Sequence, residues 1–197
     1  MAVAEPTTSP PQYLFTVDDY LKMAEVGILK ADERVELLEG IIAAMSPIGS
    51  LHAGLVIVLT ALLNKRLGDH LLLSIQNPVQ LGQRSMPQPD LAIVKWRKDF
   101  YREQVPQASD VFIVIEVSDT TLDLDRKVKA PLYAAASIPE YWIVDASGQT
   151  LEQYTQPTGD SYAQRAVFKL GESVTSVQFA ELTLTVNQIF GLDEVKE

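Results

Sequence analysis

The feature of this sequence that most constrains its fold is an unbroken run of five apolar residues, 111–115, followed by Glu116. β-Branched and aromatic residues favour strands, and a run without polar alternation fits a strand that is covered on both faces. A carboxylate at the end of such a strand is costly to bury unless it is paired, hydrogen-bonded or bound to a cation. Glu116 is therefore either an acid with a function in the interior or a solvated residue just beyond the strand.

The rest of the chain reads as alternating strands and helices. Apolar residues recur at helical spacing over residues 51–67, which predicts a long helix that packs on a sheet. The other predicted strands are residues 34–45 around Gly40, 71–75, 79–81, 91–94, 141–144, and a hairpin of 151–154 with 162–170. The other predicted helices start after Thr16 and stop at Gly27, span residues 124–137, and span residues 186–190, with Ser50 as a candidate cap of the long helix. This order predicts an α/β fold, a mixed β-sheet flanked by α-helices.

Length and composition set the expected organisation. The 197 residues suffice for one domain with a hydrophobic core, so we expect a flexible N-terminal arm over residues 1–14 and a single domain over residues 15–197. No apolar run of about 18 residues predicts a membrane span, and the start of the chain lacks the pattern of a signal peptide. The absence of cysteine excludes thiol chemistry, and the presence of only two histidines argues against a histidine-rich zinc site. A reducing cytoplasm is the expected location.

A second acidic residue, Asp90, stands where another strand is expected to begin. Pro89 precedes it and stiffens the backbone, and the apolar residues 91–94 follow. Taken alone, a Pro-Asp pair is well explained as part of a turn. Together with Glu116, however, it predicts two carboxylates on adjacent strands, which can bind Mg²⁺ or Mn²⁺ through oxygen. Such an ion polarises a phosphoryl oxygen and activates a water, so the pair points to phosphoryl chemistry.

Phosphodiester hydrolysis also needs positive charge near the phosphorus. Lys129 is the first candidate, four residues after Asp125 on the same helical face, and Lys127 is the alternative. A surface ion pair of little energetic worth explains the same spacing. Glu36 either adds a third carboxylate or is an exposed strand residue. His52, in the first turn of the long helix, either orients a water or a phosphate or is a hydrogen-bonded structural residue.

Charge and missing motifs narrow the function classes. The net charge of −10 and the pI of about 4.7 lower non-specific affinity for a phosphate backbone. The sequence has no glycine-rich nucleotide loop, no Gly-x-Ser-x-Gly elbow and no basic stripe of the helix-turn-helix kind. Nucleotide-dependent and serine-hydrolase mechanisms therefore find no support, and a nucleic-acid substrate requires a local source of positive charge.

Several short segments carry a further signal. They are residues 36–40 (ELLEG), 45–47 (MSP), His52, 87–90 (PQPD), 114–118 (VIEVS), Asp125, Lys129, Tyr133 and 138–145 (IPEYWIVD). Together these segments resemble the Uma-type restriction endonuclease family, a bacterial group within the PD-(D/E)XK nuclease superfamily. The resemblance covers roughly residues 15–190 and implies a restriction-endonuclease-like mixed sheet.

The resemblance also implies roles for individual residues. The two motif acids of the superfamily fall on Asp90 and Glu116, and the acid from the N-terminal element falls on Glu36. The superfamily's lysine would fall on position 118, where this chain has serine. In the family the lysine is displaced to the following helix, which points to Lys129.

The function that the resemblance implies is metal-dependent hydrolysis of DNA phosphodiester bonds. Asp90 and Glu116 would hold one Mg²⁺ or Mn²⁺, and Lys129 and Glu36 would complete the catalytic set. Nucleases that cut both strands often pair their sites, so a homodimer is compatible with this activity. Two alternatives stay open: a nuclease fold without cleavage that serves as a binding or regulatory module, and a hydrolase of a small phosphorylated substrate. The net charge and Ser118 favour the first alternative.

Overall fold

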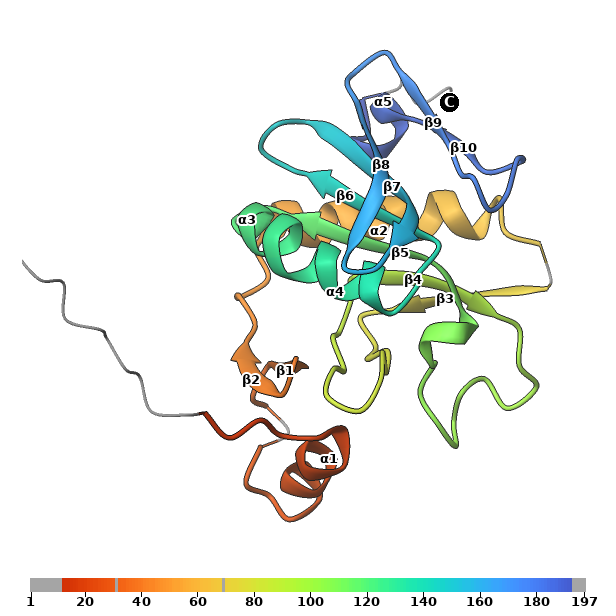
Figure 1. Ribbon diagram of the computed structural model, residues 1–197. Coiled ribbons are helices and arrows are strands. Elements are labelled where there is room, and N and C mark those ends of the chain that lie inside the picture. The colour runs from red at the N-terminus through yellow and green to blue at the C-terminus, as the bar shows by residue number, and fades with distance from the viewer. Residues whose placement is uncertain (1–11, 31, 69, 193–197) are drawn as a thin grey trace, which may run out of the picture.

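The structure is a computed structural model that describes residues 12–30, 32–68 and 70–192. At its centre lies a six-stranded sheet with the strand order β3-β4-β5-β6-β7-β8 (Figure 1). The strands are β3 (Leu71–Ile75), β4 (Leu91–Lys95), β5 (Val111–Ser118), β6 (Glu140–Asp145), β7 (Thr150–Thr158) and β8 (Ser161–Phe168). Neighbouring strands run antiparallel except β5 and β6, which are parallel. A parallel pair needs a crossover, and helices between the two strands supply it.

Helices and two small hairpins surround this sheet. The helices are α1 (Val17–Glu25), α2 (Ser50–Asn64), a 3₁₀ turn η1 (Ala108–Asp110), α3 (Leu122–Leu124), a π-helical turn η2 (Asp125–Lys129), α4 (Ala130–Ala135) and α5 (Val186–Ile189). The hairpins are β1 (Val35–Leu38) with β2 (Ile41–Ala44), and β9 (Ser173–Thr175) with β10 (Thr183–Thr185). Within the described residues, no helix is long and apolar enough to cross a membrane.

Strand β5 is covered on both faces, as its unbroken apolar run predicts. Its side chains alternate between the faces. Ile113, Ile115 and Val117 pack into one core with α2, whereas Val114 packs into a second core with Tyr133 of α4. Glu116 follows Val114 by two positions, so its side chain points toward the α4 face rather than toward solvent, and only 4% of the residue is exposed.

Most predicted elements are present, with shifts at their ends. The long helix begins at Ser50 rather than after it, because Gly49 is the N-cap and Ser50 is helical, so the prediction of a Ser50 cap is wrong. At the first helix, Thr16 is the N-cap and completes a capping box with Asp19, as expected. The helix predicted over residues 124–137 is present but divided by the π-helical turn.

The strand predicted over residues 79–81 does not form. Only an isolated bridge joins Gln80 to Gln107, because the N–H groups of Val79 and Leu81 donate to the nearby carbonyls of Pro87 and Ser85. The β9–β10 hairpin was not predicted from the sequence. Of the expected N-terminal arm, residues 1–11 lie outside the described residues.

Candidate active site

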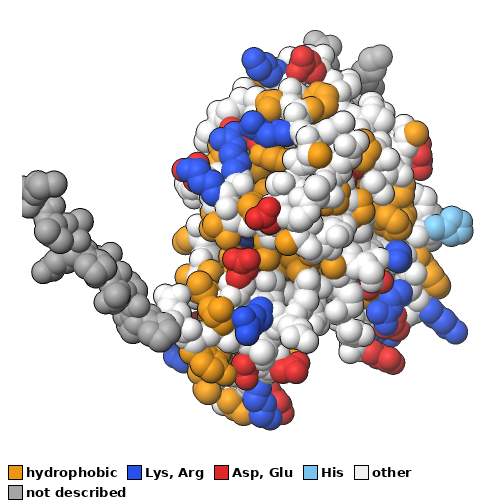
Figure 2. Space-filling model, in the orientation of Figure 1, with side chains coloured by type: hydrophobic (Ala, Val, Ile, Leu, Met, Phe, Trp, Pro, Cys, Tyr) orange, Lys and Arg blue, Asp and Glu red, His pale blue; other side chains and the backbone are white. Residues whose placement is uncertain are grey.

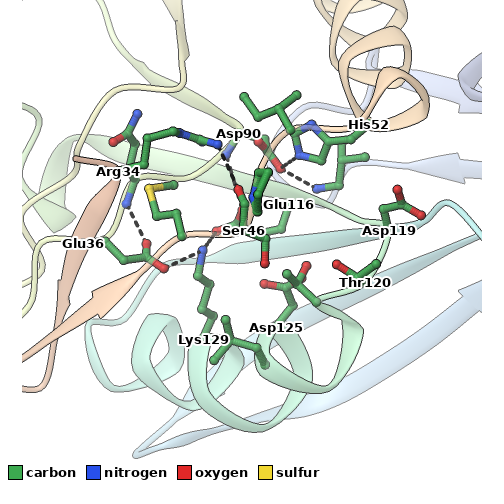
Figure 3. A pocket seen from close by; sticks show the side chains of 18 of the residues that line it. Arg34, Glu36, Ser46, His52, Asp90, Glu116, Asp119, Thr120, Asp125 and Lys129 are labelled. Atoms are coloured by element: carbon green, nitrogen blue, oxygen red, sulfur yellow. Dashed lines mark hydrogen bonds and ion pairs between the residues drawn. The ribbon is translucent and has the colours of Figure 1, made fainter. Parts of the chain in front are cut away.

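An open pocket of about 160 Å³ lies where β1, α2, β4, β5 and the π-helical turn meet (Figure 3). Its charged lining residues are Arg34, Glu36, His52, Asp90, Glu116, Asp119, Asp125 and Lys129. At ~30 Å³ per molecule, the pocket has room for roughly five waters. A small hydrated cation fits a space of this size, whereas a nucleic-acid duplex is too large to enter it.

The register of the sheet brings the two predicted motif acids together. β4 and β5 are antiparallel and pair Leu91 with Ile115, so Asp90 stands opposite Glu116 at the next step. The backbone N–H of Asp90 lies 3.4 Å from Oε2 of Glu116, as a long hydrogen bond. The two acids are thus close together, as their expected positions on adjacent strands predict.

Glu116 shares a buried cluster with one cation and a second acid. Nζ of Lys129 lies 3.0 Å from Oε1 of Glu116 and 3.3 Å from Oε1 of Glu36, and each of the three residues is at most 5% exposed. The Tyr133 hydroxyl donates to the same Oε1 of Glu116 at 2.9 Å. The backbone N–H of Gln88 donates to the other oxygen of Glu36 at 3.1 Å.

Burial and charge shift the pKa values of this cluster. Burial raises the pKa of Glu116 to about 8; Lys129 opposes that rise, while the neighbouring acids, first of them Asp125, add to it. Burial would lower the pKa of Lys129, but the charges of Glu116 and Glu36 outweigh it and raise that pKa above its ordinary value. Lys129 therefore stays protonated near neutral pH and acts as a fixed positive charge, not as a base.

Asp90 is held from two sides. Its Oδ2 accepts from the backbone N–H of Val117 and lies within hydrogen-bond distance of Nε2 of His52, both at 2.9 Å. The hydrogen bond with Asp90 is the main cause of a raised pKa at His52. Oδ1 of Asp90 accepts a long hydrogen bond, 3.3 Å, from the Gln76 side chain. His52 and Val117 therefore fix one oxygen of Asp90 and leave the other weakly engaged.

Asp125 adds a further buried acid at the pocket wall. It is 2% exposed, and its Oδ2 accepts from the hydroxyls of Ser118 at 2.6 Å and Thr121 at 2.8 Å. Ser118, two residues after Glu116, thus points at Asp125 rather than at a solvent-filled space. The ion pair between Asp125 and Lys129 that their spacing allowed does not form within the described chain, because Lys129 faces Glu116 and Glu36 instead.

The donor set of the pocket suits a hard divalent cation. Within the described part of the chain, no group of three or more acidic or histidine side chains is arranged to hold a metal ion. Mg²⁺, however, is commonly bound by one or two carboxylates with water completing its shell. Oε2 of Glu116 and Oδ1 of Asp90 accept only long hydrogen bonds from the described residues, so each keeps lone pairs for such an ion.

The pocket gathers the residues that the sequence singled out and adds one that it missed. Glu36, Asp90, Glu116 and Lys129 all line it, together with His52 and Asp125. Lys127 does not, because it pairs with Asp123 on the surface and its side chain is 69% exposed. Arg34 lines the pocket as well. Its position two residues before Glu36 in an expected strand was a signal for it, since such residues share a face.

Comparison with known proteins gives two findings. A protein-family model described as "Uma2: Putative restriction endonuclease" matches residues 17–187 of this chain. A crystal structure of "a putative nuclease belonging to DUF820" from Anabaena variabilis ATCC 29413 has a TM-score of 0.71, with 17% sequence identity over 90% of this chain and 98% of that chain. None of the curated proteins matches. The likeness to the solved structure bears out the mixed α/β fold.

Proposed function

From the premise that this chain belongs to the Uma2 restriction endonuclease family, we propose that it is a metal-dependent endonuclease that hydrolyses DNA phosphodiester bonds. The observation that carries the proposal is the position of Glu116, buried in a central strand, opposite Asp90 and in contact with Lys129. A buried acid with a strongly raised pKa beside a specific charge partner in a pocket is typical of functional sites.

Five residues of the pocket would have separate roles in this reaction. Asp90 and Glu116 would hold Mg²⁺ or Mn²⁺, which supplies a Lewis acid for a phosphoryl oxygen and a water of lowered pKa when bound. Lys129 would provide fixed positive charge where negative charge develops on the phosphate. Glu36 would position Lys129 through their ion pair, and His52 would position Asp90 through Oδ2.

Arg34 is the candidate for binding the phosphate. Its guanidinium donates to the backbone oxygen of Ser46 at 2.9 Å, and it makes no ion pair with any described residue. Lys129 and His52, the other basic residues of the pocket, already face carboxylates. An exposed guanidinium with free N–H groups suits a phosphate oxygen pair. Arg34 would thus attract a phosphate locally, in a chain whose net charge of −10 otherwise repels phosphates.

One observation favours the second candidate function, a nuclease fold that binds without cleaving. The carboxylates of Glu36, Asp90 and Glu116 each accept hydrogen bonds from protein donors, so the cluster is satisfied without a cation. A cation must then compete with Lys129 or use the weakly engaged oxygens.

A third candidate function is hydrolysis of small phosphorylated compounds. A substrate panel that includes small phosphate esters separates it from DNA cleavage.

The decisive experiment is cleavage of supercoiled plasmid with Mg²⁺ or Mn²⁺. Native protein is compared with Asp90→Ala and Lys129→Ala, and with Lys127→Ala as the matched control on the same helical segment. Metal-dependent cleavage that is lost in the first two variants and kept in the control supports the proposal. Equal activity in all four proteins, or no activity on any DNA substrate, contradicts it. Conversion of supercoiled plasmid straight to the linear form, without a nicked intermediate, would indicate two active sites that act together, as in a homodimer.

A further inference from the structure

A cluster of basic and aromatic residues lies at the opposite end of β4 from the candidate site. Residues 95–102 (KWRKDFYR) contain four basic residues, three aromatic residues and one acidic residue, in a chain with a net charge of −10. Figure 2 shows Lys and Arg side chains at the right-hand edge, with Asp or Glu side chains among them, over the segment that follows β4 in Figure 1. We refer to residues 95–102 as the basic–aromatic segment.

Two aromatic side chains of this segment face solvent. Trp96 is 48% exposed and Phe100 is 55% exposed, and their rings meet edge to face with centroids 6.4 Å apart. Each borders a separate hollow beside the edge strand β3: Phe100 lines one with Leu72, and Trp96 lines the other with Leu71. Exposed apolar side chains that lie together, rather than singly, are the ones that mark interaction surfaces.

The segment is held in its shape by internal contacts. Arg97 donates from Nε and Nη2 to the carboxylate of Asp99 at 3.0 and 2.8 Å, and its guanidinium lies 4.6 Å from the centre of the Tyr101 ring. The Tyr101 hydroxyl donates to the backbone oxygen of Lys95 at 2.9 Å. Arg97 therefore stabilises the shape of the segment. Asp99 already balances its charge, so Arg97 is not counted among the cations available to a ligand.

The backbone of the segment is strained where it presents its aromatic rings. Phe100 and Tyr101 are consecutive residues with positive φ, 53° and 58°, a conformation that bulky side chains rarely adopt. Such strain persists only where surrounding contacts impose it, and it clusters at functional sites. Here the contacts of Arg97 with Asp99 and Tyr101 flank the two residues, and Phe100 faces solvent.

Three further basic residues complete the chemistry, and one of them, Arg102, has its guanidinium 6.0 Å from the centre of the Phe100 ring. Lys95, Lys98 and Arg102 are exposed, and none of them makes an ion pair within the part of the chain that the structure describes. Proteins bind single strands by combining basic side chains, which follow the phosphates, with aromatic side chains, on which unpaired bases stack. A base-paired duplex offers the phosphates but not the free base faces.

We propose that the basic–aromatic segment docks a single-stranded stretch of nucleic acid, with bases on Trp96 and Phe100 and phosphates on Lys95, Lys98 and Arg102. The inference rests on the proposed function and deepens it, because the stretch would belong to the substrate. β4 runs from Leu91, next to Asp90, to Lys95, so the segment lies about 17 Å from the candidate site along the strand. A short extended strand spans that distance.

The first test measures binding without cleavage. A fluorescently labelled oligothymidylate of about 12 nucleotides is titrated with the native protein in EDTA, and anisotropy is followed. Trp96→Ala and Phe100→Ala are each expected to weaken binding about tenfold, and Trp96→Phe is expected to keep most of it. Lys98→Ala is expected to reduce the slope of log K against log salt by about 0.7, whereas Lys22→Ala, an exposed lysine of α1, is expected to leave it unchanged.

A second readout comes from the protein itself. The chain has two tryptophans, and Trp142 is fully buried, so a change in emission on adding the oligonucleotide reports Trp96. We expect quenching in the native protein and in Lys22→Ala, and none in Trp96→Phe. A duplex of the same length is expected to bind more weakly and to quench less.

The outcomes separate this inference from the proposed function. Binding that is unchanged in the Trp96, Phe100 and Lys98 variants overturns the inference, even if plasmid cleavage depends on Asp90. Variants that alter the sedimentation of the free protein but not oligonucleotide binding also overturn it, because the surface then joins two copies of the chain. Binding through the segment without any cleavage upholds the inference and counts against the nuclease.

Discussion

Nζ of Lys129 lies 3.0 Å from Oε1 of Glu116, inside a protein whose sequence offers no lysine two residues after that acid. The π-helical turn of residues 125–129 ends at Lys129, where the N–H of Ala130 donates to the carbonyl of Asp125, five residues back. Tyr133, one helical turn further on, donates to the same Oε1. A single helical face thus supplies to Glu116 the charge that β5 lacks. π-Helical turns occur often at functional sites.

The first prediction concerns this buried ion pair. Lys129→Met should lower the free energy of unfolding by about 3–5 kcal/mol at pH 8, because Glu36 and Glu116 lose their buried counter-charge. It should also reduce cleavage by a factor of about 10²–10³. Lys127→Met, which removes an exposed i,i+4 pair, should cost only about 0.3–0.5 kcal/mol. Urea denaturation checks both, and equal losses in the two variants would contradict the assignment.

Metal affinity should depend on pH through Glu116. Burial raises its pKa to about 8, so near neutral pH an ion that takes Oε2 must compete with a proton. We expect Mg²⁺ or Mn²⁺ affinity to rise with pH up to about 8 and then to level off. Calorimetric titration in two buffers of different ionisation enthalpy would measure the proton released. Glu116→Gln should abolish both the binding and the release, and binding independent of pH would sink the idea.

Arg34 should act on substrate binding rather than on the chemical step. Its guanidinium is exposed at the pocket and makes no ion pair with a described residue, so Arg34→Ala should leave stability within about 0.5 kcal/mol of native. The expected kinetic result is a raised KM with little change in kcat, since the contact is made equally in ground and transition states. Arg34→Lys should restore part of the loss. A large fall in kcat alone would assign Arg34 a different role.

The sequence was sufficient where one local pattern decided the outcome. The apolar run before Glu116 predicted a central strand, and the antiparallel register then had to place Asp90 beside it. The sequence could not choose between Lys127 and Lys129, because that choice depends on which face of an irregular helix meets the sheet. Arg34 was missed because its shared face with Glu36 matters only once that face is known to meet the pocket. The basic–aromatic segment was missed because only the fold shows that Trp96 and Phe100 face solvent beside β3.

Acid sensitivity of the fold should depend on Glu152, away from the candidate site. Burial would raise the pKa of Glu152, but hydrogen bonds from Arg126, Arg165 and Tyr154 outweigh it and lower the pKa from 4.5 to about 2. A carboxyl whose pKa is lowered on folding stabilises the folded state fully above its unfolded value. That contribution should therefore be complete above about pH 4.5 and be lost as the pH falls toward 2. Thermal melts of Glu152→Gln should show lower stability than native at pH 6 and a flatter dependence of stability on pH below 4.5. The control is Glu25→Gln, which removes the exposed ion pair with Lys22 and should follow the native curve.

The position of Glu36 should depend on a glycine in the hairpin that carries it. Gly40 has φ of +84°, and a Cβ there would lie 2.7 Å from the Cβ of Leu14 and 3.0 Å from the carbonyl oxygen of Phe15. Phe15 donates its N–H to the carbonyl of Gly40 at 2.9 Å, so the segment before α1 is tied to the β1–β2 turn. A side chain at position 40 must push this segment away.

Gly40→Ala should therefore destabilise the protein by more than its backbone conformation alone requires. The matched control is Gly171→Ala, because Gly171 has a similar φ of +88° and a Cβ added there would meet nothing within 4 Å. We expect about 1 kcal/mol for the control, from conformation, and a loss greater by about 1–3 kcal/mol for Gly40→Ala, from the clash. Urea denaturation measures the difference. If the clash also shifts β1, the Glu36–Lys129 ion pair lengthens and cleavage falls in Gly40→Ala only. Equal destabilisation of the two variants would show that Leu14 and Phe15 move aside without loss of stability. The position of Glu36 would then not depend on their contact with Gly40.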